Sequence, residues 1–248
     1  MTAKELNLFF DRIISKELSC DWDNDGIMCM PDPERQVKRV LITLDITKEA
    51  AEYAKKGGFD TIISHHPLIF RPLKGITSEK LIGLIKNDIC ALSFHTRLDM
   101  AQNGVNDALS EAIGLKNVEK LPPDGLGRIG ELEEEMTVED FIIRVKKALG
   151  CGRVSFVKGK DSCRRVVLVG GSGKDYIDAA FSAGADLLLT GEASYNSMAD
   201  AKELPLSVVE AGHYFTEQPV CKKIAELLKS ADPDIEAEIF ECNPVKEL

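Results

Sequence analysis

The chain has 248 residues and a formal net charge of −10, with 44% hydrophobic and 29% charged residues. This composition is typical of a globular protein with one large domain or two small ones, and it argues against a disordered chain. The acidic excess argues against broad binding to nucleic acid or to an anionic membrane, although a local basic patch stays open. No apolar run approaches the roughly 20 residues that cross a bilayer. The seven cysteines form no Cys-x-x-Cys pair, so we expect free thiols and a cytoplasmic protein.

The elements expected in the first half alternate between strands and helices. Thr2 and Glu5 have capping-box spacing at the start of a helix. An irregular stretch rich in Asp, Gly and Pro then covers residues 20–33. Strands are expected at 40–44, 61–64 and 89–93, and helices at 47–56, 78–86 and 105–113. This alternation predicts a largely parallel sheet with helices on both faces.

The clearest break in the chain is the Pro- and Gly-containing stretch at 121–125. We therefore expect one domain over 1–122 and a second over 123–248, with the option that the C-terminal segment packs back on the first. The acidic run at 131–135 is interpreted as a solvated segment before a helix at 136–149. Strands beginning at 154 and 166 follow, with further strands at 187–190, 206–210 and 235–240 and a helix at 219–228. The predicted fold is α/β, with two related three-layer domains and mixed, largely parallel sheets.

Two short patterns occur once in each half of the chain. Gly58-Phe59-Asp60 precedes one predicted strand, and Gly184-Ala185-Asp186 precedes another. His95 is followed four residues later by Asp99, as His213 is by Glu217. Two matches in the same order suggest that the halves are related α/β units.

The chain has only four histidines, at 65, 66, 95 and 213, and each directly follows a predicted strand. Ligands of parallel α/β sheets gather at the carboxyl ends of the strands. Pro67 is expected to take the chain out of the sheet, so that both His65 and His66 can face one cavity. Two adjacent imidazoles suit two metal ions, which Asp99 and Glu217 could bridge because a carboxylate has two oxygens. Nitrogen and oxygen ligands of this kind suit zinc, iron, manganese, nickel or cobalt.

Four ordered blocks resemble the NIF-three-like family, whose members are widely named GTP cyclohydrolase 1 type 2 homologues. The blocks lie at 22–26 (Trp-Asp-Asn-Asp-Gly), 64–70 (Ser-His-His-Pro-Leu-Ile-Phe), 95–106 (from His-Thr-Arg-Leu-Asp to Gly-Val-Asn) and 190–217 (from Thr-Gly-Glu to Gly-His-Tyr-Phe-Thr-Glu). The resemblance implies a two-domain α/β protomer in a toroidal homohexamer, with two divalent ions in each subunit. It carries metal binding onto five positions: His65, His66, Asp99, His213 and Glu217. His95 is expected beside the ions as a proton carrier, although its echo of His213 leaves direct ligation open.

The stretch Gly170-Gly171-Ser172-Gly173-Lys174 superficially resembles a phosphate-binding loop. It lacks the Gly-x-x-x-x-Gly-Lys-Ser/Thr spacing, and Asp175 stands where a hydroxyl residue would hold magnesium. We interpret it as a tight turn from a strand to a helix. The alternative is that its backbone N–H groups hold a substrate anion.

Two classes of function remain. One is a metal-dependent hydrolase of a nucleotide or related metabolite, in which two ions lower the pKa of a water molecule to near 7 and His95 carries protons. The other is a non-catalytic metal-binding scaffold, metal chaperone or regulatory partner. A catalytic centre keeps an open position for water, whereas a structural one is closed by protein ligands. The sequence favours the enzyme with a small-molecule substrate.

Overall fold

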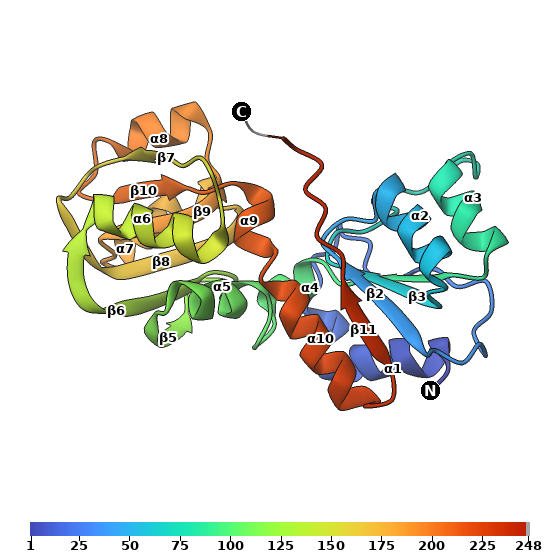
Figure 1. Cartoon of the computed structure of the whole chain (residues 1–248). Helices are drawn as coiled ribbons and strands as arrows, with labels where there is room; N and C mark the ends of the chain where they lie inside the picture. Colours follow the sequence, from blue (N-terminus) through green and yellow to red (C-terminus); the bar gives the residue numbers. More distant parts are fainter. Residues whose placement is uncertain (247–248) are drawn as a thin grey trace. The chain divides into compact units, whose positions relative to one another are not determined.

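The computed structural model describes residues 1–246, which form two compact units (Figure 1). The first unit comprises Met1–Ala101 and Cys221–Lys246, and the second comprises Gln102–Val220. This boundary differs from the expected break at 122–123. Leu121 is fully buried and its N–H donates to the carbonyl of Gly127 at 2.9 Å. The Pro-rich stretch is therefore a turn between two strands of the second unit and no linker.

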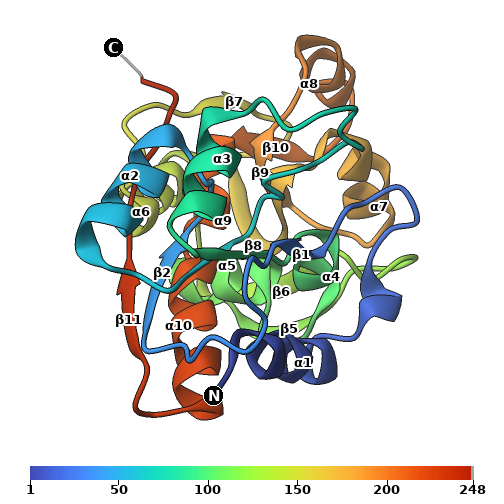
Figure 2. The ribbon, with the colours of Figure 1, turned by 90° about the vertical axis from the view of Figure 1, so that its right-hand side faces the viewer.

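The first unit is built on a five-stranded sheet with the order β1-β4-β3-β2-β11. Its strands are β1 (Gly26–Cys29), β2 (Arg39–Thr43), β3 (Thr61–Ser64), β4 (Cys90–Ser93) and β11 (Glu236–Ile239). All pairings are parallel except that of β1 with β4. Helices α2 (Lys48–Gly57) and α3 (Glu79–Lys86) cover one face, and α1 (Ala3–Ile13) and α10 (Val220–Ala231) cover the other (Figures 1 and 2). The C-terminal segment therefore belongs to the first unit.

Local sequence explains most of these elements. Thr2 accepts from the N–H of Glu5, and Glu5 accepts in return from the N–H of Thr2, so the predicted capping box is present. Strand β1 was not expected, because it lies inside the irregular stretch at 20–33. It has only four residues and a register shift after Ile27, so it is too short to show the alternation of polar and apolar residues that predicts a strand.

The second unit contains a six-stranded sheet with the order β5-β6-β8-β9-β10-β7. Its strands are β5 (Lys116–Lys120), β6 (Arg128–Thr137), β7 (Ser155–Val157), β8 (Ser162–Ser172), β9 (Leu187–Glu192) and β10 (Ser207–Glu210). Strands β8, β9 and β10 are parallel, and the other pairings are antiparallel. The helices are α5 (Val105–Ile113), α6 (Val138–Leu149), α7 (Ile177–Ser182), α8 (Tyr195–Ala201) and α9 (His213–Glu217). Both sheets are thus mixed, as the predicted fold class requires.

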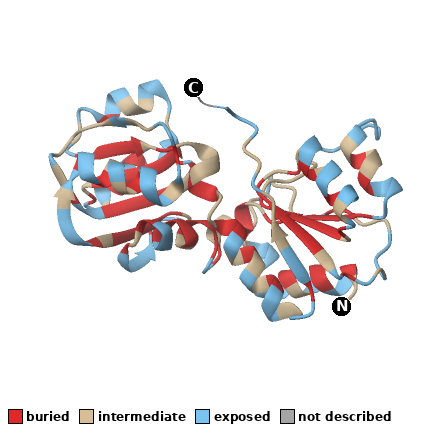
Figure 3. Cartoon of the chain, in the orientation of Figure 1, coloured by how far each residue is buried: buried red, intermediate tan, exposed pale blue. Residues whose placement is uncertain are grey.

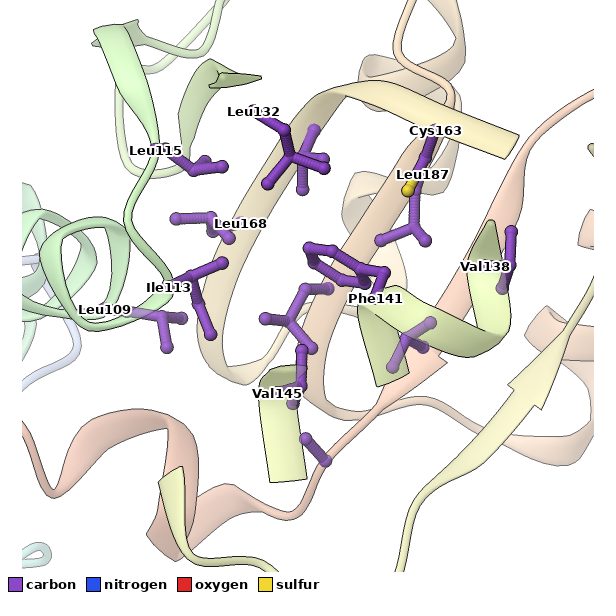
Figure 4. Packing of buried hydrophobic residues seen from close by; sticks show 14 of the residues in the cluster. Leu109, Ile113, Leu115, Leu132, Val138, Phe141, Val145, Cys163, Leu168 and Leu187 are labelled. Atoms are coloured by element: carbon purple, nitrogen blue, oxygen red, sulfur yellow. The ribbon is translucent and has the colours of Figure 1, made fainter. Parts of the chain in front are cut away.

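The acidic run at 131–135 precedes α6 and is largely exposed, as expected, but it belongs to strand β6, which the sequence did not predict. Leu132 is buried within this run, whereas Glu133, Glu134 and Glu135 are exposed. The pairing of β6 with β8 is irregular between Glu131 and Met136. The strand continues because Leu132 enters the core that α6 forms with the sheet, where Phe141 and Leu168 also lie (Figure 4).

Burial follows the sheets in each unit (Figure 3). The central strands of both sheets are almost wholly buried, and the helices are buried on the side that faces them. Among residues 1–246, no helix combines the length and the apolar character that crossing a lipid bilayer requires.

One aspartate plays the same part in each unit. Oδ2 of Asp60 accepts from the N–H groups of Lys38 and Arg39 at 2.8 and 2.9 Å. Oδ2 of Asp186 accepts from two consecutive N–H groups in the same way, those of residues 164 and 165, at 3.0 and 2.9 Å. Two residues earlier, Gly58 and Gly184 adopt left-handed conformations with φ of 67° and 72°. The units therefore share a helix–glycine–aspartate–strand module, which supports the relation that the sequence suggested.

Candidate metal centre

His65 and His66 lie directly after β3, at the carboxyl edge of the first sheet. Their N–H groups still bond to the carbonyls of Thr43 and Leu44 at 3.3 and 3.0 Å. Nδ1 of the fully buried His65 lies 2.9 Å from the carbonyl oxygen of Phe94. A carbonyl only accepts hydrogen bonds, so Nδ1 carries the proton and Nε2 keeps its lone pair.

His66 is oriented by an aspartate. Its Nδ1 lies 2.8 Å from Oδ1 of Asp45, and the hydroxyl of Ser64 donates to its carbonyl at 2.7 Å. The centroids of the His65 and His66 rings are 4.9 Å apart. The two imidazoles therefore lie side by side, as the expected departure of the chain from the sheet at Pro67 allows.

His95 lies close to His65 and His66, and its ring is also oriented by an oxygen acceptor. Its Nδ1 lies 2.9 Å from Oδ1 of Asp23, whose other oxygen accepts from the N–H and the hydroxyl of Thr96 at 3.0 and 2.6 Å. Burial acts to raise the pKa of Asp23, but the hydrogen bonds from His95 and Thr96 outweigh it and hold the pKa below its ordinary value. One nitrogen each of His65, His66 and His95 lie within 4.8 Å of one another.

Asp99 reaches this group from helix α4 (Thr96–Met100), with Oδ1 3.6 Å from Nε2 of His65. Arg97 of the same helix is fully buried and anchors it to the rest of the first unit. Its Nε donates to Asp25 and its Nη1 to Asp11, both at 2.9 Å. A buried guanidinium with two carboxylate partners has a fixed geometry, so Arg97 positions the helix that carries Asp99.

The second unit holds the remaining two predicted ligands on α9, one turn apart. Nε2 of His213 lies 3.0 Å from Oε2 of Glu217, and Nδ1 lies 2.9 Å from Oε1 of Glu192 at the end of β9. Glu217 is 5% exposed. The i, i+4 spacing therefore does place this pair on one helical face.

The glycine-rich stretch at the end of β8 packs against this pair. A Cβ added to Gly171 would lie 2.1 Å from Oε1 of Glu217 and 3.2 Å from Nε2 of His213. The N–H of Gly170 donates to Oδ1 of Asn106, and that of Gly171 to Oγ1 of Thr216, at 2.8 and 3.1 Å. These two N–H groups are thus occupied within the protein, and the glycines permit the close approach of α9.

All four histidines share one arrangement. Each Nδ1 lies 2.8–2.9 Å from an oxygen acceptor, which is the carbonyl of Phe94 or a carboxylate of Asp23, Asp45 or Glu192. Metal-binding histidines are typically fixed in this way, because the second hydrogen bond sets the tautomer and the ring orientation. The three carboxylates were not among the predicted site residues. Asp23 and Glu192 lie in blocks that the sequence singled out, whereas Asp45 carries no local signal.

The His-x-x-x-carboxylate patterns of the two units do not occupy equivalent positions in the fold. They are offset by one residue. The N–H of Phe94 donates to the carbonyl of Ser64 at the end of β3, and that of Ala211 donates to Thr190 in β9, both at 2.9 Å. This register aligns His95 with Gly212, which precedes α9 as His95 precedes α4. The position of His95 therefore differs from that of His213, which is the first residue of its helix.

A family model and individual relatives match this chain over most of its length. A family model described as Duf34/NIF3 (NGG1p interacting factor 3) matches residues 1–246. A protein of Clostridium perfringens named GTP cyclohydrolase 1 type 2 homolog is 37% identical over 249 residues, which cover 95% of each chain. A protein of Schizosaccharomyces pombe named Protein NIF3 homolog is 32% identical over 90% of this chain and 89% of its own.

Solved structures show the same fold. A hypothetical protein of Staphylococcus aureus superposes with a TM-score of 0.92 at 26% identity, covering 100% of this chain and 99% of its own. Reduced HcgD from Methanocaldococcus jannaschii superposes with a TM-score of 0.83 at 33% identity, covering 96% and 97%. The likeness in both cases extends over the two units.

Proposed function

This chain belongs to the Duf34/NIF3 (NGG1p interacting factor 3) family, and we propose that it is a hydrolase that uses two divalent metal ions to act on a nucleotide or related metabolite. The observation that carries the proposal is the common orientation of the four histidines. Each has Nδ1 at hydrogen-bond distance from an oxygen, which leaves Nε2 as the ligand atom of His65, His66 and His213 and as the proton acceptor of His95. The names of the relatives support the reaction class.

The available donor atoms fit zinc, iron, manganese, nickel or cobalt. The first unit offers imidazole nitrogens of His65 and His66 and the carboxylate of Asp99, and the second offers His213 and Glu217. Imidazole with carboxylate suits these metals and disfavours copper(I). Two ligands on α9 are too few for a closed site, since structural sites commonly use four. We therefore propose that His65, His66, Asp99, His213 and Glu217 would together hold the two ions.

The chemistry that two such ions supply is a water molecule with a pKa lowered to about 7 and a polarised substrate oxygen. The contribution of the chain is to hold a proton acceptor beside the reaction. His95 is suited to that role because Asp23 fixes its Nδ1 proton and leaves Nε2 free to accept. Asp23 is thus a positioning residue, and in the proposal His95 carries the proton without binding an ion.

The test is metal analysis of protein purified without added metal, followed by a hydrolysis screen over nucleotides, phosphodiesters and cyclic amides. We expect Asp99→Ala and Glu217→Ala to lose metal and activity while the circular dichroism spectrum and the melting stay near those of the wild type. Asp178→Asn, an exposed carboxylate of α7, is the matched control and should keep both.

Two results would contradict the proposal. Full activity in metal-free protein would exclude a metal-dependent reaction. Unfolding of the whole chain when the metal is removed would indicate structural ions and favour the non-catalytic alternatives of a scaffold or a metal chaperone.

A further inference from the structure

An exposed aromatic surface lies beside His95 in the first unit. Trp22, the only tryptophan of the sequence, is 64% exposed, and Phe70 is 47% exposed. The ring centroids of Trp22 and Phe70 are 6.4 and 6.3 Å from that of His95, at interplanar angles of 76° and 79°. Large aromatic side chains are usually well buried, so two exposed rings against a candidate site point to a binding role.

The backbone next to each ring is anchored by hydrogen bonds, on one side through the aspartate that orients His95. Trp22 is followed by Asp23, whose side chain is fully buried and binds His95 and Thr96. The side-chain amide of Asn24 donates to the carbonyl of Ile69, which precedes Phe70. Both rings are therefore attached to anchored backbone, although they come from segments far apart in the sequence.

The geometry also restricts what the surface accepts. The centroids of Trp22 and Phe70 are 6.0 Å apart with an interplanar angle of 56°. At this spacing the rings touch one another, so a ligand stacks on their exposed faces and does not enter between them. A flat ring has the shape that gains most from such a contact, because stacking on an aromatic face tolerates any base or heterocycle.

Charge on the same loop favours an acidic ligand. Arg71 and Lys74 follow Phe70 in a stretch of exposed residues, within a chain whose net charge is −10. An anionic molecule is repelled by such a chain unless cations lie near its site. The loop that carries Phe70 therefore also carries two exposed cations.

We propose that Trp22 and Phe70 bind the planar heteroaromatic ring of an anionic substrate, such as a nucleoside phosphate, and place it next to His95. This inference rests on the proposed hydrolase function and adds to it the part of the substrate that is recognised. The binding step itself needs neither metal nor turnover, so it is measured separately from the reaction.

The single tryptophan makes the test direct. Intrinsic fluorescence of the metal-loaded full chain is titrated with purine and pyrimidine nucleoside 5′-monophosphates, and with ribose 5-phosphate as the control that lacks a ring. We expect saturable quenching by at least one nucleotide and none by ribose 5-phosphate. Trp22→Leu and Phe70→Leu should each weaken the binding of that nucleotide, measured by calorimetry, roughly 10- to 100-fold. The metal content of both variants should stay unchanged. Phe181→Leu, which removes a 43% exposed ring from α7, should have no effect.

The outcomes separate the inference from the proposed function. Ring-dependent binding without any hydrolysis would support the stacking surface and refute the hydrolase. Hydrolysis with an unchanged KM in Trp22→Leu and Phe70→Leu would overturn the stacking surface and leave the hydrolase standing. Absence of quenching by every nucleotide overturns it as well. A change of oligomeric state in either variant without loss of nucleotide binding would also overturn the stacking surface. The two rings would then belong to an interface between copies of the chain.

Discussion

His95 differs from the other histidines in its place on the backbone, because it precedes a short helix instead of following β3 or opening α9. We expect His95→Ala to keep near-full metal content and to lose activity by roughly 10²- to 10⁴-fold, the usual range for a general acid–base group. Metal analysis and kcat on the same preparation check this. Loss of about half the metal would instead make His95 a direct ligand.

Gly171 offers a second test at the residue scale. It has φ of 63°, and an added Cβ would clash with Glu217. Gly184 has φ of 72° and open space around the same position. Both Gly→Ala changes carry the cost of a left-handed residue, about 1 kcal/mol, so the difference between them isolates the clash. We expect Gly171→Ala alone to lose metal affinity, measured by calorimetry; equal affinity in both variants would refute the role of the close approach.

At the scale of elements, Asp60 and Asp186 each join a strand to the start of its neighbour. Burial acts to raise the pKa of Asp186, but the hydrogen bonds from Lys160 and from the N–H groups of Arg165 and Arg164 outweigh it and hold the pKa below its ordinary value. A depressed folded-state pKa contributes stability above the ordinary carboxyl value near 4, and this contribution is lost as the pH falls through the folded-state pKa.

Asp186→Asn should therefore lower the free energy of unfolding by about 1–3 kcal/mol at neutral pH. The difference from the wild type should shrink as the solution is acidified, because the protonated aspartate then resembles asparagine. Urea unfolding at several pH values measures both quantities. Asp178→Asn serves as the control, and a difference that does not depend on pH would show that the charge of Asp186 contributes nothing.

The sequence predicted those elements whose pattern is complete within themselves. The helix at 105–113 and the strand at 61–64 were placed as the structure has them, because their periodicity and flanking glycines are local signals. Strand β1 and the acidic part of β6 were not recognised, since each depends on pairing with distant strands. In the same way, the sequence identified the histidines, but only the fold shows that Asp45 orients His66.

At the scale of the whole molecule, the boundary between the units decides which piece of chain carries its own core. A fragment of residues 102–220 contains Leu109, Ile113 and Leu115, which pack with Phe141 in the second unit (Figure 4). A fragment of residues 123–220, cut at the Pro-rich turn, lacks them. We expect the longer fragment to melt cooperatively and the shorter one not to, as followed by circular dichroism. Cooperative melting of both would show that α5 and β5 are dispensable.

Assembly is the remaining expectation at this scale. The family resemblance implies a homohexamer, so light scattering should give a mass about six times the 27.3 kDa of the chain. A mass that stays at that of one chain across a range of concentrations would contradict the ring.

The split of the first unit across the sequence has a consequence for synthesis on the ribosome. Its sheet is completed by β11, which pairs with β2 but follows the whole second unit in the sequence. The second unit is continuous, so all its strands are available once residue 220 has emerged. The unit that comes later in the sequence can therefore finish folding first. Until β11 is made, β2 of the N-terminal unit has no strand paired to its outer edge. In released chains that are truncated before residue 236, the second unit should thus resist proteases while the first one is digested.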